Sequence, residues 1–87
     1  MRLRIVLRMN IPTRKQVSVL RFINRFHASK GYPPTIRDIC THFGFASTKA
    51  ATDHVAALMA KGLASKESRI ARSIMPTDAG YKLLREA

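Results

Sequence analysis

The stretch "GYPPTIRDICTHFGFASTKAATDHVAALMAKG", residues 31–62, decides the fold of this chain. Its two prolines fix an extended turn, and Thr35 then caps a short helix that ends at Gly44. Ser47 is a good N-cap for the following helix, whose alanines favour helix formation and close packing. A short helix, a tight glycine turn and a longer helix with small residues together predict a helix-turn-helix.

Each of these two helices has one apolar face. At 100° per residue, the longer helix turns Ala51, Val55 and Leu58 inward. The buried stripe of the shorter helix is formed by Ile36, Ile39 and Phe43. These stripes predict that both helices pack against one common core.

A third helix is predicted upstream. Thr13 and Gln16 form a T-x-x-Q capping box, and the helix runs from there to about Ser29. Lys30 and Gly31 then supply a C-terminal cation and a left-handed stop. The inward side of this helix holds Val19, Leu20, Ile23, Phe26 and His27. The outward side holds Arg14, Ser18, Arg21 and Arg25.

The segment after Gly62 has strand character. Two short runs with alternating apolar residues, about Leu63–Lys66 and Ile70–Met75, flank a polar turn and predict a hairpin. Pro76 should end it. Thr77 should cap a last helix, about Asp78 to Arg85, that buries Tyr81 and Leu84 or Leu83. The predicted fold is mainly α with a small β-hairpin: a winged helix-turn-helix with a three-helix core, a wing and a short C-terminal helix, spanning residues 13–87.

Residues 1–12 stand apart from this domain as a basic arm or strand. "RLRIVLR" alternates charged and apolar side chains, which is the periodicity of a strand. An edge strand, a pairing arm and a basic tail lying on DNA all fit, as does a true start at Met9. The segment lacks a long apolar core and a cleavage site, so it does not read as a signal peptide.

The composition points to an anionic partner. The 87 residues favour one small domain, and 16 Lys and Arg against 5 Asp and Glu give a formal net charge of +11. This excess predicts attraction to nucleic acid or to an anionic membrane, and it exceeds what solubility requires. Cys40 is the single cysteine, which excludes an internal disulfide and fits a reducing cytoplasm. No apolar run is long enough to span a bilayer.

Most of the chain, about Ile11 to Met75, resembles the DNA-binding domain of the LexA repressor family. The resemblance is carried by "TRKQVSVLRFINRF", "GYPPTIRDICTHFGF", "AATDHVAALMAKGL" and "RIARSI". It implies a winged helix-turn-helix that binds double-stranded DNA at the nucleoid of a bacterium or in a phage-infected cell. Members of this family carry a second domain, a self-cleaving serine–lysine peptidase that also dimerises, and the present sequence ends before one could fit. The tail "PTDAGYKLL" is more similar to the end of MarR-type regulators.

Three residues of the helix after Ser47 are predicted to read bases, because the start of this helix enters the major groove in the motif. Lys49 can donate to guanine N7 and O6, Asp53 can accept from cytosine N4, and Thr52 can contact thymine. Alternatively, Lys49 and Asp53 form only a surface pair worth a few tenths of a kcal/mol. The LexA-like proteins typically have Asn, Glu and Glu at these three positions, which implies a different target sequence here.

Contacts with the DNA backbone are predicted from helix starts and from the wing. The helix beginning at Thr35 crosses the backbone in this motif, the start of the next helix favours a phosphate, and a basic wing can straddle phosphates or enter the minor groove. A solvated charged turn is the alternative for the wing. The predicted backbone contacts are Thr35, Arg37, Ser47, Thr48, Lys66, Arg69, Arg72 and Ser73.

Metal and catalytic sites are not indicated. Cys40 and His42 are two apart on a helix and point to different sides, and neither His27 nor His54 has a partner at ligand spacing. The carboxylates are scattered, and no nucleophile has a base at a suggestive spacing. We therefore expect no cofactor, no small-molecule ligand and no enzymatic activity.

The sequence thus predicts a DNA-binding regulator of transcription, specifically a repressor in the cytoplasm. Useful specificity from so small a domain implies a homodimer on a palindrome or tandem repeat. Two alternatives remain: the DNA-binding part of a self-cleaving SOS-type repressor, and a winged module that binds protein instead of DNA. Peripheral membrane binding by residues 1–12 ranks last, because their alternation makes a poor amphipathic helix.

Overall fold

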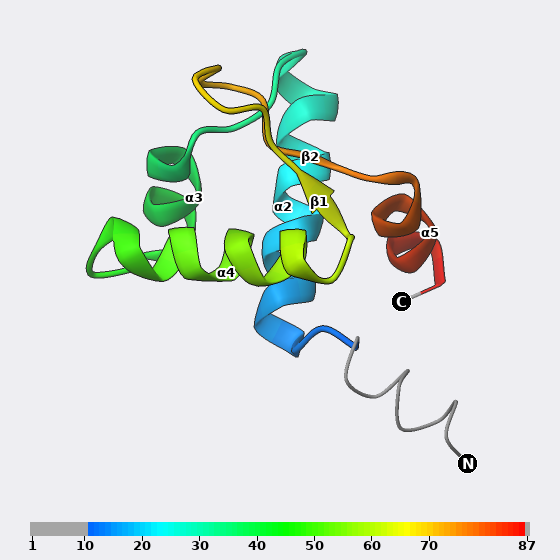
Figure 1. Cartoon of the computed structure of the whole chain (residues 1–87). Coiled ribbons are helices and arrows are strands. Elements are labelled where there is room, and N and C mark those ends of the chain that lie inside the picture. Colours follow the sequence, from blue (N-terminus) through cyan, green and yellow to red (C-terminus); the bar gives the residue numbers. More distant parts are fainter. Residues whose placement is uncertain (1–10, 87) are drawn as a thin grey trace.

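The computed structural model describes residues 11–86 and confirms the predicted winged helix-turn-helix (Figure 1). Residues 1–10 of the predicted N-terminal arm lie outside the described part of the chain. Within residues 11–86, three helices are followed by a two-stranded antiparallel hairpin and then by one more helix. In chain order the elements are α2 (Arg14–Lys30), α3 (Ile36–Phe43), α4 (Thr48–Ala60), β1 (Ala64–Ser65), β2 (Met75–Pro76) and α5 (Asp78–Glu86).

The predicted capping boxes set the starts of α2 and α3. The Thr13 hydroxyl accepts from the Gln16 amide at 3.1 Å, and the Gln16 side chain accepts from the Thr13 amide at 3.1 Å. Thr35 and Asp38 make the same two bonds at the start of α3, at 3.1 and 2.9 Å. Gly44 ends α3 in the left-handed region, at φ 69°, where a side chain would be strained. The turn between α3 and α4 is therefore encoded locally.

The core lies where α2, α3 and α4 meet the hairpin. The inward stripe of α4 is confirmed, whereas Phe26, His27, Ile36 and Phe43 are only half-buried. Ile36 and Phe43 pack against the core, and Phe22 contacts both Phe43 and Phe26, so an aromatic cluster continues outward from the core. No helix within residues 11–86 is long and apolar enough to cross a membrane. The buried apolar residues are Val19, Leu20, Ile23, Ile39, Ala51, Val55, Leu58, Leu63, Ala64 and Ile74.

The hairpin, residues 64–76 and here called the wing, has shorter strands than the sequence predicted. Ala64 pairs with Pro76 and Ser65 pairs with Met75, and the ladder stops there. The hairpin does end at Pro76, but this proline is itself the last residue of β2 and pairs with Ala64, which a strand with only one neighbour permits. The alternation around Ile70 does not mark a strand, because the residues from 66 to 74 form turns and Ile70 is 52% exposed.

Helix α5 begins as predicted, with the Thr77 hydroxyl accepting from the Gly80 amide at 3.1 Å. The same hydroxyl donates to the Gly62 carbonyl at 2.6 Å and so ties α5 to the end of α4. Tyr81, Leu83 and Leu84 are less buried than predicted, since all three residues are half-buried. Gly80 is the buried residue of this helix, and its Cα side faces the backbone of Leu63 without room for a Cβ.

Candidate nucleic-acid interface

The outer face of α4 carries the three residues predicted to read bases. Lys49, Thr52 and Asp53 are all exposed, while the opposite side of the helix is buried in the core. This division follows from the helical period, because Ala51 and Val55 must point inward to complete the core. The N-terminal half of α4 is thus a polar, accessible surface on a helix whose position is held by its inward residues.

Lys49 and Asp53 form an ion pair one turn apart along α4. The Lys49 Nζ lies 3.2 Å from Asp53 Oδ2 and 3.4 Å from Oδ1. Their side chains are 81% and 62% exposed, so the pair is worth about 0.2–0.5 kcal/mol. A base contact worth about 1–3 kcal/mol would outweigh it. The ion pair and a base-reading role are therefore compatible.

Ser47 occupies the N-cap position of α4 with extended backbone angles, but its hydroxyl makes no capping bond. The prediction that its side chain caps the helix was wrong on this point. Ser47 and Thr48 are both exposed, and no side-chain bond caps the first turn of α4. Amides at a helix start, together with hydroxyl donors, are groups that hydrogen-bond to phosphate oxygens.

A depression of about 240 Å³, here called the wing cleft, separates α4 from the wing. Thr52, Ala56 and Met59 line it from α4, and Lys66 and Ser68 line it from the wing. The fold therefore brings Thr52 and Lys66, two residues of the predicted site, to one surface. Sequence reasoning did not assign Met59 or Ser68 to the site. Met59 could have been found by continuing the outward face of α4 past Thr52 and Ala56.

The tip of the wing carries two exposed cations, Lys66 and Arg69. Arg69 adopts φ 70° and is the one non-glycine residue among residues 11–86 with a positive φ. That conformation costs a non-glycine residue on the order of 1 kcal/mol and turns the chain sharply at the tip. Both side chains can reach a phosphate without breaking an ion pair, because the two ion pairs within residues 11–86 involve other residues.

Arg72 fastens the wing to the turn between α2 and α3, an arrangement here called the latch. Its Nη1 donates to Asp38 Oδ2 at 3.1 Å and to the Pro33 carbonyl at 3.2 Å. Its guanidinium lies over the Tyr32 ring, 4.6 Å from the centroid. Arg72 was predicted to contact DNA phosphate, and the structure gives its guanidinium three partners within the protein.

The other predicted backbone residues divide into bonded and free side chains. The Ser73 hydroxyl closes the wing loop, since it accepts from the Glu67 amide at 3.0 Å and lies 2.9 Å from the Ile70 carbonyl. Thr35 is engaged in its capping box, whereas Arg37, the second residue of α3, is exposed. The exposed cations of the predicted site that lie outside the latch are therefore Arg37, Lys49, Lys66 and Arg69. Arg72 is bound within the latch.

Asp38 joins the capping box of α3 to the latch. The Thr35 backbone amide, the Thr35 hydroxyl and Arg72 together lower the pKa of the Asp38 carboxyl below its ordinary value of 3.8, although burial opposes this. A lowered folded-state pKa contributes stability that is complete above the unfolded pKa and is lost as the pH falls through the folded pKa. The latch is therefore intact near neutral pH and weakens only in acid.

Replacing Asp38 by Asn should lower the free energy of unfolding by about 0.5–1 kcal/mol at pH 7. The difference from the parent chain should be smaller at pH 2, because the Asp38 carboxylate is lost progressively as the pH falls through its lowered folded-state pKa. Urea unfolding at the two pH values measures both effects. Asp53→Asn is the matched control, because its exposed pair with Lys49 should change stability by no more than about 0.5 kcal/mol. A loss of equal size at pH 7 and pH 2 would contradict the role of charge in the latch.

The cysteine and two of the histidines have structural contacts. The Cys40 thiol donates to the Phe45 carbonyl at 3.3 Å, His42 stacks on Phe22, and His54 stacks on Phe45. Within residues 11–86, no three side chains of His, Cys, Asp or Glu come together as a metal site would need. The chemistry that the described surface offers is hydrogen bonding and positive charge.

Known proteins with a similar sequence extend well beyond the length of this chain. The LexA repressor of Sorangium cellulosum (strain So ce56) is 39% identical over 66 residues, which are 76% of this chain and 29% of that protein. The LexA repressor of Limosilactobacillus fermentum (strain NBRC 3956 / LMG 18251) is 39% identical over 72 residues, 83% of this chain and 35% of that protein. The LexA repressor of Anaeromyxobacter dehalogenans (strain 2CP-1 / ATCC BAA-258) is 40% identical over 72 residues, which are 83% of this chain and 32% of that protein. The chain thus spans about a third of the length of these relatives.

The match to a protein family coincides with the helix-turn-helix and the wing. The family model described as the LexA DNA binding domain matches residues 9–73, which include α2, α3, α4, β1 and the wing loop. It ends before β2 and α5. Since the match covers well over half of the chain, this chain belongs to the LexA DNA-binding domain family.

Proposed function

We infer that this chain binds double-stranded DNA in a sequence-specific way and represses transcription. The observation that carries the proposal is the exposed polar face of α4 beside the wing cleft, in a chain of the LexA DNA-binding domain family. Lys49, Thr52 and Asp53 would read base edges in the major groove. The proposed setting is the cytoplasm of a bacterium or of a phage-infected cell, with DNA as the partner and no enzymatic step.

Phosphate contacts would come from three places. Arg37 near the start of α3, the Ser47–Thr48 start of α4 and the wing cations Lys66 and Arg69 all present free donors. Each phosphate that a cation neutralises steepens the salt dependence of binding by about 0.9 in the logarithmic slope. The net charge of +11 supports the same expectation of strong attraction to the duplex at low salt.

Met59 extends the proposed contact surface toward the wing. Its side chain is 40% exposed and lines the wing cleft with Thr52 and Ala56. An exposed apolar strip beside polar groups suits the methyl group of a thymine, which projects into the major groove. We therefore place the second half of the base-reading surface at Ala56 and Met59.

A selection from random duplex DNA at two salt concentrations tests the proposal. We expect one enriched motif at both concentrations, with affinity that falls steeply between about 50 and 200 mM salt. Two copies of the motif at a fixed spacing near one helical turn would show a dimer on a palindrome or repeat. Failure to enrich any motif at either concentration would overturn sequence-specific binding.

A second candidate places the same domain within a larger repressor. The relatives named LexA repressor are about three times as long as the matched region. In this case the domain would supply DNA binding to a protein whose other part cleaves itself and dimerises, as LexA-like proteins do. Western blotting of the native host before and after DNA damage distinguishes the cases, because self-cleavage replaces one longer band by two shorter ones.

A further inference from the structure

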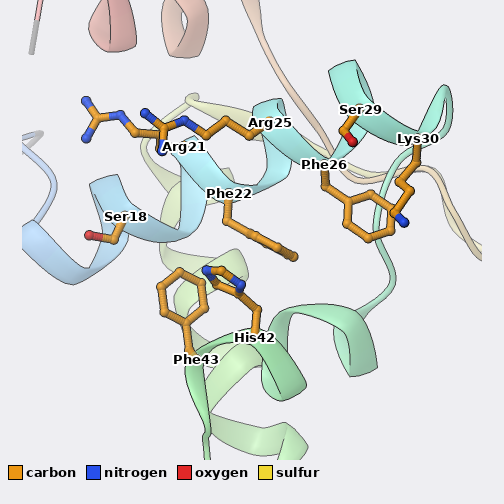
Figure 2. A pocket seen from close by; sticks show the side chains of 9 residues that line it. All are labelled: Ser18, Arg21, Phe22, Arg25, Phe26, Ser29, Lys30, His42 and Phe43. Carbon is orange, nitrogen blue, oxygen red and sulfur yellow. The ribbon is translucent and has the colours of Figure 1, made fainter.

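A depression of the described surface lies between α2 and the end of α3, and is here called the aromatic groove (Figure 2). Its volume is about 570 Å³. Figure 2 shows Phe22 pointing from α2 toward His42 of α3, with Phe26 further along the same helix. Arg21 and Arg25 also line the groove from α2. None of the residues that line this groove was predicted to contact DNA.

The groove is elongated and has two parallel stripes. Ser18, Arg21 and Arg25 follow one another at helical spacing on α2, and Phe22 and Phe26 form an apolar stripe beside them. The lining runs along α2 from Ser18 to Lys30, about 18 Å at the rise of an α-helix. A shallow trough of this length suits a peptide segment better than a compact small molecule.

The charge of the groove has no counterpart within it. Arg21, Arg25 and Lys30 line it, and no Asp or Glu does. The two ion pairs found among residues 11–86 are Lys49–Asp53 and Arg72–Asp38, so these three cations are free to pair with an external carboxylate. An acidic segment would find both apolar contact and opposite charge here.

The rings of the groove argue against a nucleic acid strand as the occupant. Phe22 is stacked on His42 with centroids 4.2 Å apart and planes 19° apart, and Phe43 meets its edge at 5.8 Å. Bases stack on free ring faces, whereas these rings pack mainly on one another and form an apolar floor. A second copy of the chain is also disfavoured, because it would bring like charges together. Residues 1–10 hold three arginines and no carboxylate, so their charge does not fit either.

We propose that the aromatic groove is the docking site for an acidic amphipathic segment of a partner protein. Leucine or phenylalanine side chains of the partner would cover Phe22, Phe26 and His42, and its carboxylates would pair with Arg21 and Arg25. This helix-in-groove mode recruits a partner through a surface separate from α4 and the wing. It would allow one domain to contact DNA and a regulatory protein at the same time.

The test uses a fluorescent synthetic peptide of about 12 residues, long enough as a helix to follow the groove. Its residues are leucine or phenylalanine at every third or fourth position and glutamate elsewhere. Fluorescence polarisation with the full chain should show saturable binding. A peptide with glutamine in place of glutamate should bind at least about tenfold more weakly. No saturable binding up to millimolar protein would overturn the proposal.

Paired charge reversals separate the groove from net charge. Arg21→Glu with Arg25→Glu reverses two of the three cations of the groove. Lys82→Glu with Arg85→Glu makes the same change of net charge at exposed sites of α5. The first variant should bind the acidic peptide about tenfold more weakly than the second. Equal binding would overturn the proposal. If the double variant unfolds, the single variants Arg25→Gln and Lys82→Gln are compared instead, since both positions are exposed. The first should then bind the acidic peptide more weakly than the second.

A single-stranded oligonucleotide of the same charge as the peptide completes the test. Tighter binding of the oligonucleotide, lost on reversal of Arg21 and Arg25, would assign the groove to nucleic acid and overturn the peptide proposal. Proton resonances of the exposed His42 ring report whether the acidic peptide sits in the groove, and their failure to shift would also overturn it. The experiments contain no duplex DNA, so their outcome is independent of the DNA-binding proposal.

Discussion

Replacing Gly80 by alanine should destabilise the protein by about 1–3 kcal/mol, as inserting a methyl group into a filled site does. A Cβ at this position would overlap the carbonyl oxygen of Leu63 and lie 3.2 Å from the Pro76 Cβ. Neither neighbour is a flexible side-chain end: one is backbone and the other a proline ring carbon. The melting temperature should fall by roughly 5–20 °C, measured by circular dichroism.

The sign of this result is informative, because glycine to alanine inside an exposed helix stabilises by about 1 kcal/mol. The close approach of α5 to the backbone of Leu63, the residue before β1, reverses that sign. Ala79→Leu is the matched control, since Ala79 is exposed on the same turn and should change stability by no more than about 0.5 kcal/mol. An alanine variant at Gly80 as stable as the parent would contradict the packing of α5 against Leu63.

Replacing Lys49 by alanine should weaken binding to the selected duplex about 10- to 100-fold, the worth of one good base contact. The existing pair with Asp53 contributes only a few tenths of a kcal/mol, so its loss does not account for an effect of that size. The preference at one base pair should relax at the same time. Anisotropy titrations with the selected duplex and with single base-pair variants, at one fixed salt concentration, measure both effects.

Two lysine controls distinguish base reading from charge. Lys82→Ala removes the same charge from α5 and should change affinity only slightly. Lys66→Ala on the wing should weaken binding to all duplexes alike and reduce the magnitude of the salt slope by about one. If Lys49→Ala behaves like Lys82→Ala, then Lys49 is only half of a surface ion pair and the base-reading proposal for it fails.

The parts of the fold that depend on neighbouring residues could be predicted from the sequence. The capping boxes at Thr13 and Thr35 involve residues three positions apart, so their pattern can be recognised in the amino-acid sequence. The outward direction of Lys49 and Thr52 follows from the period of α4 once its apolar residues are placed. Local patterns of this kind place α2, α3 and α4 and the exposed face of the candidate site.

The parts that depend on distant residues could not be predicted. Arg72 and Asp38 are separated by 34 positions, and nothing in the basic stretch around Arg72 distinguishes a latch from a phosphate contact. The alternation of apolar residues around Ile70 suggested a strand, but in the structure the Ser73 hydroxyl hydrogen-bonds within the wing loop instead of the segment pairing as a strand. In the sequence, Gly80 is only a residue of low helix propensity. The structure shows why a glycine is needed there, because the backbone of Leu63 lies against it. These features belong to tertiary packing.

The latch also bears on how quickly and tightly the domain can engage a duplex. Because Arg72 holds the wing to the turn that precedes α3, the tip cations keep a set distance from α4 before any partner arrives. A pre-organised wing has little conformational entropy left to lose on association. In the proposed complex, the wing would then need little rearrangement on binding, because the latch already joins it to the turn before α3 in the free protein.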